Sequence, residues 1–184
     1  MTEGSERVSL GVTWMFLLLC WGSCATLGWF SSFDLPVRVQ DPGYHPWDEV
    51  ADIAATNLTV ALSLVSGAAT AGMSTLATTV VVSTYTGVVI SAAADDLGLS
   101  GTLRAILPYF AFELAGLLCA AVVGLLPSCC ALRHGWRGTT ARSRAGAALR
   151  GYLVGLRMSL PWLIASVLLI AVGAVLEVAG GVPR

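Results

Sequence analysis

The sequence predicts an all-α integral membrane protein, a polytopic helical bundle of about five transmembrane helices with an additional cytoplasmic amphipathic helix. Hydrophobic residues make up 56% of the 184 residues and charged residues only 11%, and the mean hydropathy is +0.79. A soluble domain usually carries about 25% charged residues. The bilayer is therefore the expected solvent for most of the chain, which excludes a soluble globule and a disordered chain. We expect residues 1–184 to form a single membrane domain.

Five apolar runs approach the roughly 20 residues that cross a hydrocarbon layer of about 30 Å. The first is expected to be a retained anchor rather than a cleaved signal peptide, because acidic Glu3 and Glu6 precede it and Trp14 and Trp29 suit the two interfaces. Residues 53–94 hold no charge and are too long for one crossing, so we divide them at the small and hydroxyl residues 72–75. The expected spans are 12–30, 53–72, 75–94, 105–126 and 161–178.

The charged residues predict which way the bundle faces. The loop 127–160 contains six Arg and no acidic residue, whereas the loop 31–52 contains one Arg against five carboxylates. Loops rich in Lys and Arg stay in the cytoplasm. We therefore expect the N-terminus inside, the acidic loop outside and the C-terminus outside. The five carboxylates belong to Asp34, Asp41, Asp48, Glu49 and Asp52, and the six Arg are Arg133, Arg137, Arg142, Arg144, Arg150 and Arg157.

Glu113 is the most informative polar residue, because it lies near the middle of an expected span. A carboxylate there costs at least a few kcal/mol unless it is paired or hydrated. At helical spacing it shares a face with Gly116 and Gly124, which predicts a helix seam or a cavity rather than a lipid-facing position. Tyr109, one turn earlier, brings a hydroxyl to nearly the same face. Two interpretations stay open: a substrate, proton or catalytic site, and a buried carboxyl that ties helices together.

Two further residues are candidates for the same path or seam. Asn57 lies near the outer end of the second span, where its amide can bridge helices or line a cavity. Glu177 lies near the outer end of the last span, on a face with Gly173, where an interfacial carboxylate is the simpler interpretation.

The cytoplasmic loop is expected to contain a basic amphipathic helix, with an elbow near Met158 and Ser159 capping the last span. Apolar residues recur at helical spacing, and docking to anionic lipids or to a cytoplasmic partner such as an ATPase are the two interpretations. The Arg residues that would make these contacts are Arg142, Arg144, Arg150 and Arg157.

The sequence lacks the residues that metal binding, nucleotide binding and nucleic-acid binding usually require. The chain has two His and no Lys, and no Gly-rich run resembles a nucleotide loop, so we expect no metal, no cofactor and no nucleic-acid partner. Five Cys at scattered positions predict neither a disulfide framework nor a zinc site.

Three stretches resemble the stage II sporulation protein M family of small polytopic bacterial membrane proteins. They are Asn57 followed by the small-residue stretch 66–75, the run Leu-Pro-Tyr-Phe-Ala-Phe-Glu-Leu at 107–114, and the closing run 163–177 that ends in Glu177. The family proline is typically followed by His and Gly, where this chain has Tyr109 and Phe110, so it resembles a divergent member. Glu113 and Glu177 match the family positions.

The resemblance implies a subunit of a complex in the bacterial cytoplasmic membrane. In that family, the role is that of a scaffold for cell-wall hydrolases. Related proteins accompany ABC-type ATPases in the maturation and export of bacteriocin peptides. The leading hypothesis is a non-enzymatic, permease-like or scaffolding subunit that contacts lipids and an ATPase or another membrane subunit, with a peptide substrate and a homo-oligomer left open. The alternative is a membrane-embedded peptide-processing enzyme that uses Glu113 as general acid or base. A lipid-facing protein without a specific site is a third hypothesis.

Overall fold

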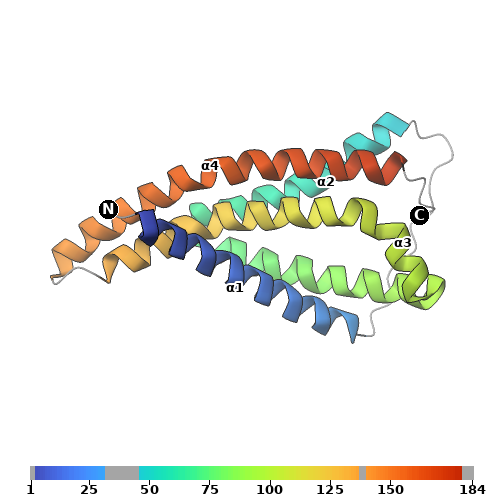
Figure 1. Ribbon diagram of the computed structural model, residues 1–184, viewed down its shortest axis with the longest axis horizontal. Coiled ribbons are helices and arrows are strands. Elements are labelled where there is room, and N and C mark those ends of the chain that lie inside the picture. Colours follow the sequence, from blue (N-terminus) through green and yellow to red (C-terminus); the bar gives the residue numbers. More distant parts are fainter. Residues whose placement is uncertain (1–2, 32–45, 137–139, 180–184) are drawn as a thin grey trace.

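The computed structural model describes residues 3–31, 46–136 and 140–179, and every element in these ranges is a helix (Figure 1). Parts of the predicted acidic loop, including Asp34 and Asp41, and Arg137 of the basic loop lie outside the described residues. The elements are α1 (Glu3–Trp29), α2 (Pro46–Val65), the short 3-10 helix η1 (Ser66–Ala68), α3 (Met73–Gly135) and α4 (Ala141–Ala179).

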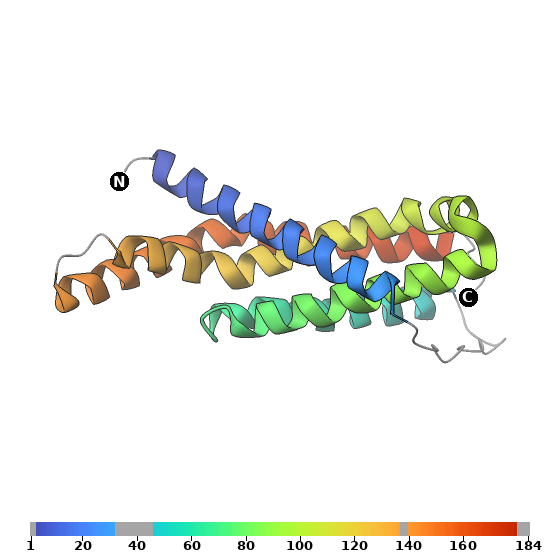
Figure 2. The ribbon, with the colours of Figure 1, turned by 90° about the horizontal axis from the view of Figure 1, so that it is seen from below.

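Four of these helices are long and apolar enough to cross a membrane, which agrees with the predicted all-α membrane class. The third, α3, has 63 residues and contains one non-helical residue, Gly98, with φ 70° and ψ 155°. Figures 1 and 2 show that α3 turns around in this region and runs back beside its own first part. We call residues 73–97 the first arm of α3 and residues 99–135 the second arm.

The α2–α3 turn lies a few residues before the predicted break. α2 ends at Val65 rather than at residue 72, so the expected span 53–72 is placed too late. Local hydroxyl bonds end the helix: the Ser66 and Ser74 side chains are 2.7 Å apart across the turn. Ala71 and Gly72 then take positive φ values of 53° and 89°, which reverse the chain.

α4 joins the predicted amphipathic segment to the last span. The helix is continuous over 39 residues, so the segment 142–157 is the first part of α4 and no helix break occurs at the expected elbow. Ser159 does not cap a new helix, because it is buried and its hydroxyl donates to the carbonyl of Gly155 at 2.8 Å. Pro161 is accommodated inside the helix. Packing of α4 against α3 stabilises the continuous helix where the local sequence favours a break.

Glycines bring the second arm of α3 and α4 into close antiparallel contact. A Cβ atom at Gly155 would lie 2.5 Å from Pro127 Cα, and one at Gly116 would lie 2.8 Å from Ile170 Cγ1. Closer to the start of α4, Gly151 packs against the carbonyl oxygen of Cys130. These contacts leave room for a hydrogen atom but not for a methyl group. We call this contact the glycine seam, and it is the packing mode that small residues allow in membranes.

α1 crosses both arms of α3, as Figure 2 shows. Near its start Ser9 accepts a hydrogen bond from Arg133 Nη1 at 3.3 Å. One further turn on, the Trp14 ring packs edge-to-face on Trp162 of α4, with ring centroids 5.2 Å apart. Toward its end Gly28 packs against the backbone of Thr84 in the first arm. α1 therefore holds the two arms and α4 together from one side.

The described charges separate toward the two ends of the bundle. The end that contains the start of α2, the Gly98 turn and the end of α4 carries mostly carboxylates, with Arg104 as its basic residue. The end with the α3–α4 connection is rich in Arg and also contains the start of α1, which includes Glu3 and Glu6 (Figure 1). Exposed Leu, Ile and Val side chains cover the helices between the two ends. This pattern is typical of a membrane-spanning bundle. The carboxylates are Asp48, Glu49, Asp52, Asp95, Asp96 and Glu177.

Candidate site at the junction of three helices

Asn57 and Glu113 are in direct contact between α2 and α3. The Asn57 Nδ2 atom donates a hydrogen bond to Glu113 Oε1 at 2.7 Å. Asn57 belongs to the packed face of α2, between Ile53 and Ala61 at four-residue steps, both of which are buried. The helical spacing of α2 therefore points this amide at the rest of the bundle.

Glu113 lies at the edge of the most buried part of the molecule. Residues 116–128 of α3 are all buried, whereas Ala111 and Phe112 are exposed, and Glu113 is half-buried between them. The second arm is thus the central helix of the bundle, and Glu113 lies where it begins to be enclosed by its neighbours. By helical rise this position is about 20 Å from residue 126.

α4 closes the third side of the site through Gly173. A Cβ atom at Gly173 would lie 2.5 Å from Glu113 Cγ and 3.4 Å from the carbonyl oxygen of Tyr109. The Glu113 stem and the Tyr109 backbone therefore rest directly on the backbone of α4. Glu177 follows Gly173 by one turn on the same face and is half-buried. The structure thus joins Asn57 to Glu113, places Tyr109 beside them and puts Glu177 one turn toward the acidic end.

The Asn57–Glu113 pair can serve as a structural tie or as a proton site. Hydrogen bonds between membrane helices contribute about 0.6 kcal/mol on average, whereas an ionised carboxylate in a span costs at least a few kcal/mol. A glutamine at position 113 would accept the same bond from Asn57 without an ionisable group. An ionised carboxyl is therefore an expensive way to join α2 and α3, whereas a protonated one ties the two helices without that cost, so the geometry fits both a tie and a proton site.

The described helices contain no group of three or more His, Cys, Asp or Glu that could hold a metal ion. All five cysteines are free thiols. The arrangement at Glu113 offers a carboxyl, an amide and backbone groups, and these can hold or release a proton or bind a polar group of a ligand.

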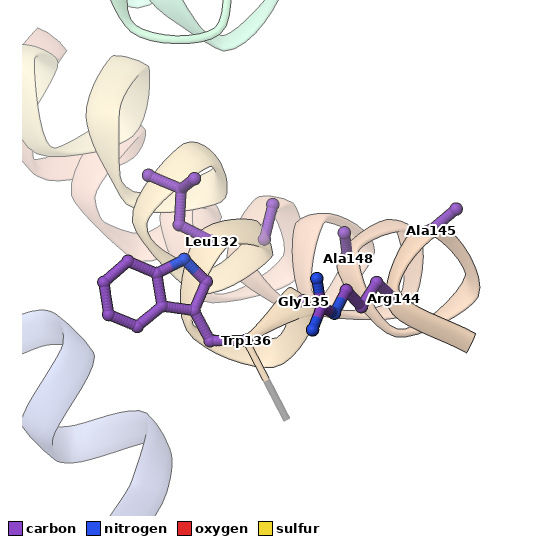
Figure 3. A pocket seen from close by; sticks show the side chains of 7 residues that line it. Leu132, Gly135, Trp136, Arg144, Ala145 and Ala148 are labelled. Carbon is purple, nitrogen blue, oxygen red and sulfur yellow. The ribbon is translucent and has the colours of Figure 1, made fainter. Parts of the chain in front are cut away.

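The predicted docking residues lie on the first half of α4, and one of them lines a groove. Arg144 lies with Ala145 and Ala148 opposite the end of α3, around an open groove of about 650 Å³ (Figure 3). Arg142, Arg150 and Arg157 are exposed on the same helix and do not line it. α3 contributes Ala131, Leu132 and Gly135, and Trp136 follows directly after that helix.

Two features of this region were not expected from the sequence. The Tyr152 hydroxyl donates to the carbonyl of Ala68 and so attaches α4 to the α2–α3 turn. Beyond this contact the end of α3 and the start of α4 continue as a paired hairpin, which Figures 1 and 2 show projecting past the turn. The signal was available in the four-residue spacing of Gly151 and Gly155, which predicts close helix packing across the expected loop.

No family model, curated protein or solved structure matches the chain.

Proposed function

We propose that this chain is a non-enzymatic, permease-like membrane subunit of a larger complex, with about five crossings of which α3 supplies two. Each arm of α3 is longer than the roughly 20 residues that a crossing needs, and the chain turns at Gly98 among exposed, acidic residues. In this arrangement the Arg-rich end faces the cytoplasm, with the N-terminus inside and the C-terminus outside.

The observation that carries the proposal is the continuity of α4 from the projecting hairpin to the Glu113 site. The helix has 39 residues, a length of about 58 Å at 1.5 Å per residue. The glycine seam joins it to the second arm of α3 from Gly151 to Gly173, where Glu113 lies. A force applied to the hairpin by a partner would therefore move the same rigid unit that holds Glu113 against α2.

The Asn57–Glu113 bond is the element that such a movement would change. At the site the Asn57–Glu113 hydrogen bond joins α2 to α3, and at the other end of α2 the Tyr152–Ala68 contact holds the turn that follows the helix. Displacing the seam would break this bond and expose the carboxyl to a proton or to a polar group of the cargo. The resemblance to the stage II sporulation protein M family supports an ABC-type ATPase as partner and a bacteriocin-like peptide as cargo.

The test is purification of the tagged full-length chain from its native membranes in a mild detergent. We expect an ATPase to purify with it in a fixed ratio and to hydrolyse ATP at a rate that depends on the seam. Gly155→Leu, which disrupts the packing of the seam, should change the rate of hydrolysis at least about fivefold, which corresponds to the lower end of the roughly 1 to 3 kcal/mol that overpacking costs. Gly22→Leu is the matched control, because nothing lies within 4 Å of the Cβ position at Gly22. Purification of the chain without any partner would refute the proposal.

A further inference from the structure

The groove at the tip of the α3–α4 hairpin has the features of a protein docking site. Leu132 and Trp136 lie at one end, and Arg144 and Ala148 of α4 lie at the other (Figure 3). The Trp136 ring is 87% exposed and Leu132 is 65% exposed. Trp and Arg are the residue types that most often dominate binding energy at protein interfaces. Leaving an exposed indole in water is unfavourable, and burying its apolar surface under a partner protein contributes favourable binding free energy.

Small residues line the middle of the groove. Gly135 packs on α4, since a Cβ atom there would lie 3.4 Å from Ala148 Cβ. Ala131 and Ala145 complete the small-residue lining, so bulky side chains stand only at the rim. A volume of about 650 Å³ lies within the range of sites that enclose a ligand or a few side chains.

The charge around the groove selects an acidic occupant. Residues 114–176 contain six Arg and no acidic residue. Arg144 lines the groove, and Arg142 and Arg150 flank it on α4. A carboxylate from a partner would find guanidinium donors in the fork geometry that favours bidentate pairing.

The distance from the bilayer favours a protein over a lipid headgroup. The α2–α3 turn exposes Ser66 and Thr70 and belongs at the polar interface rather than in hydrocarbon. The groove residues on the α3 side, from Ala131 to Trp136, follow Ser128, which lies beside that turn, by three to eight positions, or about 5 to 12 Å along the helix. The headgroup layer is about 5 to 7 Å thick on each side. Most of the groove therefore lies at or beyond the outer limit of the headgroups.

We infer that this groove docks an acidic amphipathic segment of a peripheral partner protein, whose apolar side chain covers Trp136 and Leu132 and whose carboxylate pairs with Arg144. The inference rests on the proposed function and names the contact surface of its partner. Binding of a helix in a groove through apolar anchors and flanking charges is a common mode of peptide recognition.

The test is site-specific photo-crosslinking of the full chain in its native membranes. A benzophenone amino acid replaces Leu132 in one variant and Leu149 in the control, because Leu149 is 62% exposed on the same hairpin but does not line the groove. We expect a protein adduct from position 132 whose crosslinked peptide, identified by mass spectrometry, lies in an acidic amphipathic segment. Position 149 should give at most a tenth of the yield.

A charge reversal completes the test. Arg144→Glu should reduce the adduct from position 132 about tenfold, because it removes one partner of a charge pair at an interface. Arg104→Glu makes the same charge change at an exposed position near the opposite end of the bundle and should reduce it less than about twofold. Adducts with lipid alone, equal yields from both positions, or equal effects of the two reversals would overturn the docking site while the purified complex still supports the proposed function. Absence of any copurifying partner would overturn both.

Discussion

Asn57 of α2 donates a hydrogen bond from its side-chain Nδ2 to Glu113 Oε1 at 2.7 Å, at the point where Gly173 of α4 contacts the Glu113 stem. Fifty-six positions separate the two residues in the chain. Their contact joins three helices at one point between the acidic and the Arg-rich ends of the bundle. It also makes the two possible roles of Glu113, as a tie and as a proton site, separable by experiment.

Glu113→Gln should keep the bundle intact, because glutamine accepts the same hydrogen bond from Asn57. We expect the free energy of unfolding to change by less than about 1 kcal/mol, because even complete loss of one interhelical hydrogen bond would cost only about that much. Steric trapping or denaturant titration in detergent measures this. Under the proposed function the variant loses coupling to the partner although it folds. Full activity of the variant would show that the proton and the charge are dispensable.

Glu113→Leu should destabilise the protein, because it leaves the half-buried Asn57 amide without its acceptor. The expected loss is about 1 to 2 kcal/mol. The double variant Asn57→Leu with Glu113→Leu removes both polar groups and should recover part of that loss. If the single variant is neutral or more stable than the native chain, Glu113 has no specific site, as the third hypothesis from the sequence states.

Gly173→Leu should disrupt the three-helix junction, because a Cβ at that position would lie 2.5 Å from Glu113 Cγ. Overpacking of this kind costs about 1 to 3 kcal/mol. Thermal unfolding in detergent should therefore show a lower transition temperature than that of Gly11→Leu, whose Cβ position has nothing within 4 Å. Equal transition temperatures would mean that α4 does not contact Glu113 in this way.

Gly98→Ala should destabilise the turn between the two arms of α3. The native φ of 70° and ψ of 155° lie near a backbone region that only glycine enters easily, and other residues pay about 1 to 3 kcal/mol there. Gly146→Ala, inside α4 with open space around it, should instead be neutral or stabilising by up to about 1 kcal/mol. Similar behaviour of the two variants would contradict the turn at Gly98.

Trp14 and Trp162 should couple α1 to α4. A double-mutant cycle to Ala is expected to give an interaction energy of about 0.5 to 1.5 kcal/mol, the usual range for aromatic pairs beyond their area burial. Purely additive effects of the two substitutions would show that the edge-to-face contact is absent in the folded protein.

The sequence predicted the class of fold because composition and apolar runs depend on the solvent, and the bilayer imposes the same demand on every span. It also predicted that Glu113 faces a helix seam or a cavity rather than lipid, from the small residues on its helical face. It did not identify Asn57 as the partner of Glu113, because a contact between residues 56 positions apart depends on how helices pack.

The boundaries that were wrong have one cause in common. The expected elbow at Met158 followed from local signals, Ser159 and Pro161, that usually start a helix. Close packing of Gly155 on Pro127 stabilises a continuous helix instead. The expected end of the second span at residue 72 also followed from a local signal, the small and hydroxyl residues 72–75, whereas hydroxyl bonds of Ser66 end α2 at Val65. In both places side-chain and backbone contacts override the local pattern.

The most direct measurement of the central claim is the distance between α4 and α2 in the purified complex. Spin labels at Leu153 and Leu62, both exposed and outside the groove, report this distance by double electron–electron resonance in a background without native cysteines. We predict that the distance distribution shifts when the partner binds ATP, and that Gly155→Leu abolishes the shift while Gly22→Leu keeps it. Identical distributions with and without ATP in the native sequence would contradict the claim that the hairpin transmits partner movement to Glu113.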